Sequence, residues 1–162
     1  MGKGADVLIN AVEQYEFVHL DIAGPVSAEM RERSKSFFSN PRVNYLGLLS
    51  RKDLAAAMVN ADIFLFPSFA EGSARVVFEA LACGCYVITT PNSGSIVEDG
   101  VHGALVPPGD VRACVGAIEF ALRNPGVISE IGKSNADSIR KQYRQRDYGD
   151  RLAGLYKELI HL

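Results

Sequence analysis

The sequence lacks several features that would assign it to whole classes of protein. None of its apolar runs reaches the ~18 residues that a membrane-spanning helix needs, and its N-terminus shows no signal-peptide pattern. A formal net charge of −2 argues against a broad nucleic-acid-binding surface. We therefore expect a protein that neither spans a membrane nor binds nucleic acid, although a helix N-terminus could still bind an anionic small ligand.

Cysteine and histidine are scarce, with three of each in 162 residues. Cys83 and Cys85 are separated by one residue, whereas zinc ribbons and redox motifs use C-x-x-C. We interpret the cysteines as small buried side chains of a cytoplasmic protein. The histidines have no partners at metal-ligand spacing, so no metal site is expected. A G-x-S-x-G nucleophile elbow and a G-K-[ST] phosphate loop are also missing.

Helical and strand patterns alternate along the chain without a linker or repeat, which indicates one domain over residues 1–162. This alternation predicts a Rossmann-like α/β fold, in which helices cover both faces of a parallel sheet. Helices are expected at 5–14, 27–38, 54–60, 76–83, 110–123, 127–143 and 147–160, and strands at 17–23, 43–46, 63–66, 86–90 and 104–106.

Four loops follow the expected strands, at 24–27, 47–51, 67–73 and 89–94. Parallel sheets bind ligands beyond the carboxyl ends of their strands, so the chemistry should lie in these loops. Ser27, Ser50 and Asp110 are expected to cap the helices that follow them. The strand at 63–66 is continuously apolar, as in strands that are buried on both faces.

The segment from Glu71 to Gly84 carries the most specific pattern. Gly72 lets the backbone approach a ligand closely, and Ser73 can cap a helix whose free N–H groups favour a phosphate. Glu79 lies about seven residues beyond Gly72, which is roughly 10 Å along a helix, and a charge within its apolar stretch is costly to bury. One glutamate could hold a hexose and the other a ribose. Alternatively, Glu71 is a loop acid and Glu79 a solvated helix residue.

In its context this segment resembles the C-terminal domain of family 4 glycosyltransferases, the retaining group of the GT-B fold (glycosyl transferases group 1). The shared pattern is a glutamate, seven residues, and a second glutamate followed by Ala-x-Ala-Cys-Gly. ADIFLFPS at 61–68 precedes it, and VITT at 87–90 and GALVPPGD at 103–110 follow it. The ordered match runs from about residue 3 to residue 159. It implies the nucleotide-sugar-binding half of a two-domain, cytoplasmic enzyme, with a role in cell-envelope polysaccharide synthesis.

The resemblance also implies residue roles. Glu71 would be catalytic, contacting the donor sugar near the reacting carbon, and Glu79 would bind the ribose hydroxyls. The donor would be a nucleotide diphosphate sugar such as a UDP- or GDP-sugar, bound without metal or other cofactor. The remaining donor contacts would be Lys3 at the pyrophosphate, backbone at Leu49 beside the base, Gly24 and Gly72 lining the site, and backbone N–H groups of Ser73, Ala74 and Arg75 at the sugar and distal phosphate.

This sequence also departs from the family pattern. Many relatives have Glu-Gly-Phe-Gly where this chain has Glu-Gly-Ser-Ala at 71–74. Arg75 replaces the usual apolar residue and is either a phosphate contact or a solvated arginine. The family domain opens with a central Gly-Arg strand and follows an N-terminal acceptor domain, and neither is expected here. A strand from another copy (strand exchange or a homodimer), from another polypeptide or from a rearrangement would complete the sheet, and the chain alone would bind donor without turnover.

Two further functions stay open on the sequence. The chain could be a non-catalytic nucleotide-sugar-binding module that works with a separate N-terminal chain, or part of a phosphosugar epimerase of the same two-domain shape. Basic residues also cluster towards the C-terminus, at Arg140, Lys141, Arg144 and Arg146. They form either a solvated face or a contact with the missing domain or with the inner face of a membrane.

Overall fold

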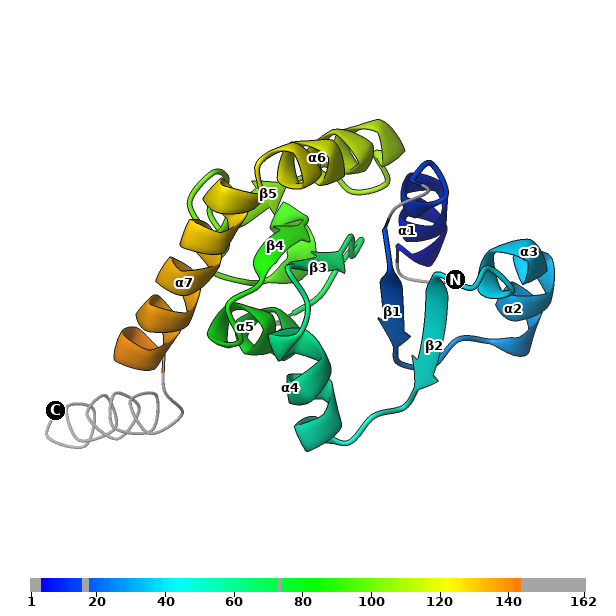
Figure 1. Ribbon diagram of the computed structural model, residues 1–162, viewed down its shortest axis with the longest axis horizontal. Helices are drawn as coiled ribbons and strands as arrows, with labels where there is room; N and C mark the ends of the chain where they lie inside the picture. Colours follow the sequence, from blue (N-terminus) through cyan, green and yellow to red (C-terminus); the bar gives the residue numbers. More distant parts are fainter. Residues whose placement is uncertain (1–3, 16–17, 73, 144–162) are drawn as a thin grey trace, which may run out of the picture.

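The computed structural model describes residues 4–15, 18–72 and 74–143, in which helices and strands alternate (Figure 1). The strands are β1 (Leu20–Ala23), β2 (Val43–Gly47), β3 (Ile63–Phe66), β4 (Tyr86–Thr89) and β5 (Gly103–Leu105). The α-helices are α1 (Ala5–Val12), α2 (Ala28–Arg33), α3 (Lys35–Phe38), α4 (Arg51–Val59), α5 (Arg75–Ala82), α6 (Val111–Arg123) and α7 (Pro125–Gln142), with a short 3₁₀ turn η1 (Pro91–Ser93). The helix expected at 147–160 lies outside the described residues.

The strands form two parallel sheets, with the orders β1–β2 and β3–β4–β5. The expected α/β fold with parallel strands is confirmed, but the sheet is divided between β1 and β3. No strand among the described residues pairs with the free edge of either one. Figure 1 shows β1 and β2 on one side of the molecule and the three-stranded sheet on the other.

Helices cover both faces of the three-stranded sheet, and β4 lies between the two layers. All four residues of β4 are buried, and its side chains alternate between two apolar clusters. Ile88 packs with side chains of α1 and α6, whereas Val87 packs with α4, α5 and α7. Because the first cluster also includes Ile22 of β1, it joins the two sheets through shared apolar contacts.

The strand β3 is less buried than its sequence suggests. Its four apolar residues were expected to be buried on both faces, but each of them is only partly buried. The reason is the divided sheet, since β3 pairs with β4 on one edge only. The rings of Phe64 and Phe66 stack on one face of the strand, with their centroids 6.0 Å apart.

The three expected helix caps are confirmed. Ser27 accepts from the N–H of Met30 at 3.1 Å, Ser50 from Asp53 at 3.2 Å, and Asp110 from Ala113 at 2.9 Å. Because Ser50 is the cap, α4 begins three residues before the predicted Leu54. The helix predicted over 27–38 is divided into α2 and α3 at Ser34, whose φ of −111° and ψ of 36° interrupt the helical backbone.

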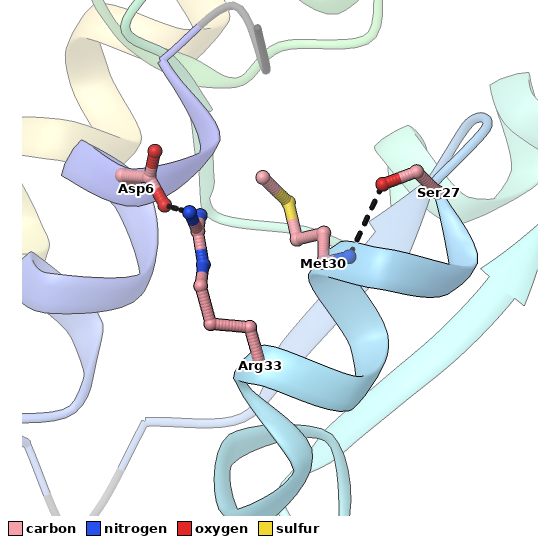
Figure 2. A network of polar contacts seen from close by, with 4 residues as sticks. All are labelled: Asp6, Ser27, Met30 and Arg33. Carbon is pink, nitrogen blue, oxygen red and sulfur yellow. Dashed lines mark hydrogen bonds and ion pairs between the residues drawn. The ribbon is translucent and has the colours of Figure 1, made fainter.

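An ion pair joins α2 to the first turn of α1. Figure 2 shows the side chain of Arg33 reaching from α2 to the carboxylate of Asp6, beside the Ser27 cap of the same helix. An acidic residue in the first turn also suits the positive end of the α1 dipole. Both side chains are well exposed, so we expect this pair to orient the two helices while adding little stability.

Candidate functional site

Two loops at the carboxyl edge of the three-stranded sheet are fastened together. One follows β3 and the other follows β4. Three side chains of the β4 segment donate to carbonyl oxygens of the β3 segment: Thr89 to Phe66 at 2.8 Å, Thr90 to Ser68 at 2.6 Å, and Asn92 to Phe69 at 2.9 Å. The loop that carries Glu71 and Gly72 is therefore held by side chains of its neighbour.

Backbone contacts extend this attachment to Glu71 itself. The Glu71 N–H donates to the carbonyl oxygen of Asn92 at 2.8 Å, which fixes the backbone that carries its carboxylate. Gly94 lies against Gly72, because a Cβ built at Gly94 would come within 2.5 Å of the Gly72 carbonyl oxygen. Gly94 also has a φ of +60°, a backbone conformation that residues with a side chain rarely adopt. The position of Gly72 thus depends on the absence of a side chain at Gly94.

The start of α5 differs from the predicted arrangement. The helix begins at Arg75, and its N-cap is Ala74, which makes no side-chain cap hydrogen bond. Ser73 lies outside the described residues. The resemblance implied that the Ala74 N–H contacts the sugar or the phosphate. In this structure it instead donates to the carbonyl oxygen of Ser93 at 3.0 Å and is not available to a ligand. The N–H groups of Arg75 and Val76, in the first turn, have no intrahelical acceptor.

Glu79 lies on the open face of α5. Val77, Ala80 and Leu81 turn inward and are fully buried, whereas the Glu79 side chain is 39% exposed. Its apolar neighbours do not bury this carboxylate, because the helix is amphipathic, and the alternative that Glu79 is a solvated helix residue stays open. Its carboxylate oxygen Oε1 lies 3.4 Å from Nη2 of Arg51, the first residue of α4.

The loops after β1 and β2 lie next to each other. The Gly24 N–H donates to the Gly47 carbonyl oxygen at 2.8 Å, and the Tyr45 hydroxyl donates to the Gly24 carbonyl oxygen at 3.1 Å. Gly24 has a φ of +116°, which only glycine adopts readily. Leu49 is half-buried and precedes Arg51 by two residues. The Arg51–Glu79 contact therefore connects this pair of loops with α5.

The start of α1 lies at the end of β3. Lys3 is outside the described residues, but the next residue, Gly4, is in direct contact with Pro67. A Cβ built at Gly4 would lie 1.9 Å from the Pro67 carbonyl oxygen, and Gly4 has a φ of +79°. Printed contacts therefore join the loops after β3 and β4 with the start of α1, and join the loops after β1 and β2 with each other. The Arg51–Glu79 contact links these two groups of segments. Together they carry the sequence-predicted residues Gly24, Leu49, Glu71, Gly72, Arg75 and Glu79.

Two surface cavities lie near the opposite ends of the strands. One of about 390 Å³ is lined by Val12, Phe37 and Val43, and one of about 280 Å³ by Asp62, Gly84 and Lys133. Val43 begins β2, and Asp62 directly precedes β3. Because parallel sheets bind ligands at the carboxyl ends of their strands, we assign neither cavity to the candidate site.

The model of one protein family, described as glycosyl transferases group 1, matches residues 1–124 of the chain. The chain belongs to this family. It is 29% identical over 168 residues to a D-inositol 3-phosphate glycosyltransferase of Mycobacterium ulcerans (strain Agy99), with 98% of this chain and 36% of the relative covered. It is 30% identical over 146 residues to a phosphatidyl-myo-inositol mannosyltransferase of Mycobacterium leprae, covering 86% and 39% respectively.

Solved structures of glycosyltransferases share the fold. A sucrose-phosphate synthase of Thermosynechococcus elongatus superposes with a TM-score of 0.87 at 25% identity, covering 98% of this chain and 43% of the other. Anabaena HepE in complex with UDP superposes with a TM-score of 0.81 at 26% identity, covering 99% and 46%. The chain thus has the GT-B architecture of one half of these proteins and spans less than half the length of the relatives named here.

Sequence reasoning missed two parts of the site. Arg51 was not singled out, although a cation directly after the Ser50 cap and two residues from Leu49 was a usable signal. The side-chain attachment through Thr90 and Asn92 could not be read from the sequence, because it joins residues more than 20 positions apart.

Proposed function

We propose that the chain is the donor-binding domain of a retaining glycosyltransferase that takes a nucleotide diphosphate sugar. The observation that carries this proposal is the spacing of Glu71 and Glu79 on either side of the α5 start, within a family of sugar transferases. Glu71 lies on the fastened loop and would hold the sugar, and the exposed Glu79 would accept from the ribose hydroxyls. The related HepE structure with UDP-glucose supports this class of donor.

The leaving diphosphate is stabilised by fixed positive charge. The first-turn N–H groups at Arg75 and Val76, with the dipole of α5, face a developing negative charge that the departing nucleotide carries. Arg75 is exposed and Lys3 precedes the Gly4 contact with Pro67, so both side chains are assigned to the phosphates. In this proposal these groups act without a metal ion, and Glu71 is the catalytic residue at the sugar.

The divided sheet favours a partner for this domain. β1 and β3 present free edges, and the relatives named above are more than twice as long as the chain. We assign acceptor binding to an N-terminal GT-B domain, in the same polypeptide or as a separate chain. A further strand, from another copy, another polypeptide or a rearrangement, would fill the gap between β1 and β3. A cytoplasmic role in cell-envelope glycan synthesis is consistent with the inositol-directed mycobacterial relatives.

Calorimetry on the 162-residue chain with UDP-glucose and GDP-mannose tests this assignment. Glu79→Ala should weaken binding of the preferred donor by about tenfold or more, because hydrogen bonds to a carboxylate are lost. Glu71→Ala should weaken binding of the nucleotide sugar but leave binding of the free nucleoside diphosphate unchanged, since Glu71 is assigned to the sugar. Glu130→Ala, an exposed glutamate on α7, is the matched control and should bind like the wild type.

Two outcomes would contradict the assignment. One is a wild-type chain that unfolds cooperatively, and is therefore folded, yet binds neither nucleotide sugar nor free UDP or GDP. The other is a Glu79→Ala variant that binds as tightly as the wild type.

A further inference from the structure

The helices α4 and α5 pack side by side, with the first turn of α4 beside the second turn of α5. Leu54 and Met58 of α4 share an apolar cluster with Val77 of α5. The Cys83 thiol, one turn beyond Glu79, lies 3.9 Å from the Ala55 carbonyl oxygen. This packing fixes the separation of the two helices, so the contact between Arg51 and Glu79 is set by the core beneath it.

The contact between Arg51 and Glu79 uses only a small part of the hydrogen-bonding capacity of the two side chains. Nη2 of Arg51 lies 3.4 Å from Oε1 of Glu79, and the two side chains are 82% and 39% exposed. A guanidinium has five N–H donors, and a carboxylate has about four acceptor sites. The pair can therefore persist while the carboxylate accepts hydrogen bonds from hydroxyl groups of a ligand.

We propose that Arg51 is a positioning residue for the nucleotide, acting through Glu79. Its guanidinium holds the Glu79 carboxylate in the orientation that accepts from the two ribose hydroxyls. It also offsets the carboxylate charge, which would otherwise repel the diphosphate. This inference rests on the proposed function, because it assumes that Glu79 faces a ribose.

The packing of α4 against α5 does not depend on this pair. Exposed ion pairs contribute little to folding, and the α4–α5 contact is already made by buried apolar side chains. Arg33 and Asp6, at the far end of the described structure from α5, form a comparable exposed pair between two helices, with both side chains 59% exposed. That pair serves as an internal comparison, since it joins helices without approaching Glu79.

The test is calorimetry on the full chain with UDP, GDP and their 2′-deoxy and 3′-deoxy forms, using whichever base binds more tightly. Arg51→Ala should weaken binding of the ribonucleotide by about fivefold, which is the upper range for the loss of one exposed charge pair. The deoxy forms should lose less, because they make fewer hydrogen bonds to Glu79. Arg51→Lys should restore part of the affinity, since lysine keeps the positive charge but lacks the planar set of N–H donors of the guanidinium.

A double-mutant cycle separates action through Glu79 from direct contact with the ligand. In the Glu79→Gln background, replacing Arg51 by alanine should have no further effect on affinity. Lys52→Ala removes the neighbouring exposed cation of the same helix turn, and Arg33→Ala breaks the comparison pair. Both should bind the nucleotide like the wild type, and all variants should unfold at similar urea concentrations.

Each remaining outcome counts against the positioning role, the proposed function or both. If Glu79→Gln weakens binding but Arg51→Ala does not, the positioning role is wrong and the proposed function stands. If Arg51→Ala weakens ribo and deoxy forms equally and also in the Glu79→Gln background, Arg51 acts directly and not by positioning. If the folded wild type binds no nucleotide, or Glu79→Gln has no effect, both claims fall.

Discussion

Single glycines set the distances at the candidate site. Gly4 and Gly94 both have positive φ angles, and a side chain at either would collide with the backbone of the loop after β3. At Gly4 the obstacle is the Pro67 carbonyl, and at Gly94 it is the Gly72 carbonyl. These residues bring the start of α1 and the loop after β4 against the segment that carries Glu71.

The sequence located the residues of the candidate site, but it did not predict their solvent exposure or their hydrogen-bond partners. The pattern located Glu71 and Glu79 and predicted that Gly72 lies in a loop, because spacing and residue type are local properties. It left open whether Glu79 is solvated, because exposure depends on which face of α5 meets the core. It also assigned the Ala74 N–H to a ligand, because its hydrogen bond to Ser93 joins two loops that sequence spacing does not relate.

The buried Cys85 thiol predicts a dependence of stability on alkaline pH. Burial raises the pKa of this thiol from 9.0 to about 12. Folding therefore favours the protonated thiol, and this contribution is complete below pH 9 and lost as the pH rises towards 12. The urea midpoint should fall as the pH rises from ~9 towards ~12, and it should fall less steeply in Cys85→Ala.

The half-buried Cys83 provides the control for this pH series. Cys83→Ala should reduce the slope less than Cys85→Ala, because Cys83 is less buried. Lysines and tyrosines titrate at high pH in all variants, so the comparison uses differences in slope. Equal slopes in the wild type and Cys85→Ala would show that this thiol ionises alike in the folded and unfolded chain.

At the scale of elements, the caps were the most reliable signals. Ser27, Ser50 and Asp110 were predicted correctly because a cap depends on residues within one turn. The alternation of strands and helices was also predictable, since apolar periodicity is local. The open edge of β3 was not read from its apolar run, because burial of a strand depends on which strands pair with it.

The attachment between the loops after β3 and β4 predicts a contrast between two buried hydroxyl groups. Thr90 donates to the Ser68 carbonyl oxygen at 2.6 Å, whereas Ser68 Oγ has no hydrogen-bond partner among the described residues. Thr90→Val should therefore lower the free energy of unfolding by about 1–3 kcal/mol, because a buried acceptor loses its donor. Ser68→Ala should change it by less than about 0.5 kcal/mol.

Urea denaturation at one pH measures both variants, and each serves as the control for the other. An equal loss in Ser68→Ala and Thr90→Val would show that the Thr90 hydrogen bond adds no stability beyond that of a buried hydroxyl without a partner. The attachment also matters for binding, since the same loop carries Glu71 and Gly72. Thr90→Val should accordingly weaken binding of the nucleotide sugar more than Ser68→Ala does.

For the whole molecule, the division between β1 and β3 was indicated by the resemblance, which implies a further central strand to complete the sheet. Parallel strands were predictable from their alternation with helices, but pairing between strands was not. The apolar cluster that includes Ile22 and Ile88 crosses the division, so the two sheets share a core although they share no hydrogen-bonded ladder. The proposed function assigns the acceptor to a partner domain.

Hydrogen exchange of the full chain, with and without saturating UDP-glucose, tests the central claim most directly. The account predicts that protection on binding concentrates in residues 47–53, 67–79 and 90–94, which carry the loops and the starts of α4 and α5. Saturable binding whose protection instead lies around the cavity beside Val12, Phe37 and Val43, at the other end of the strands, would contradict it.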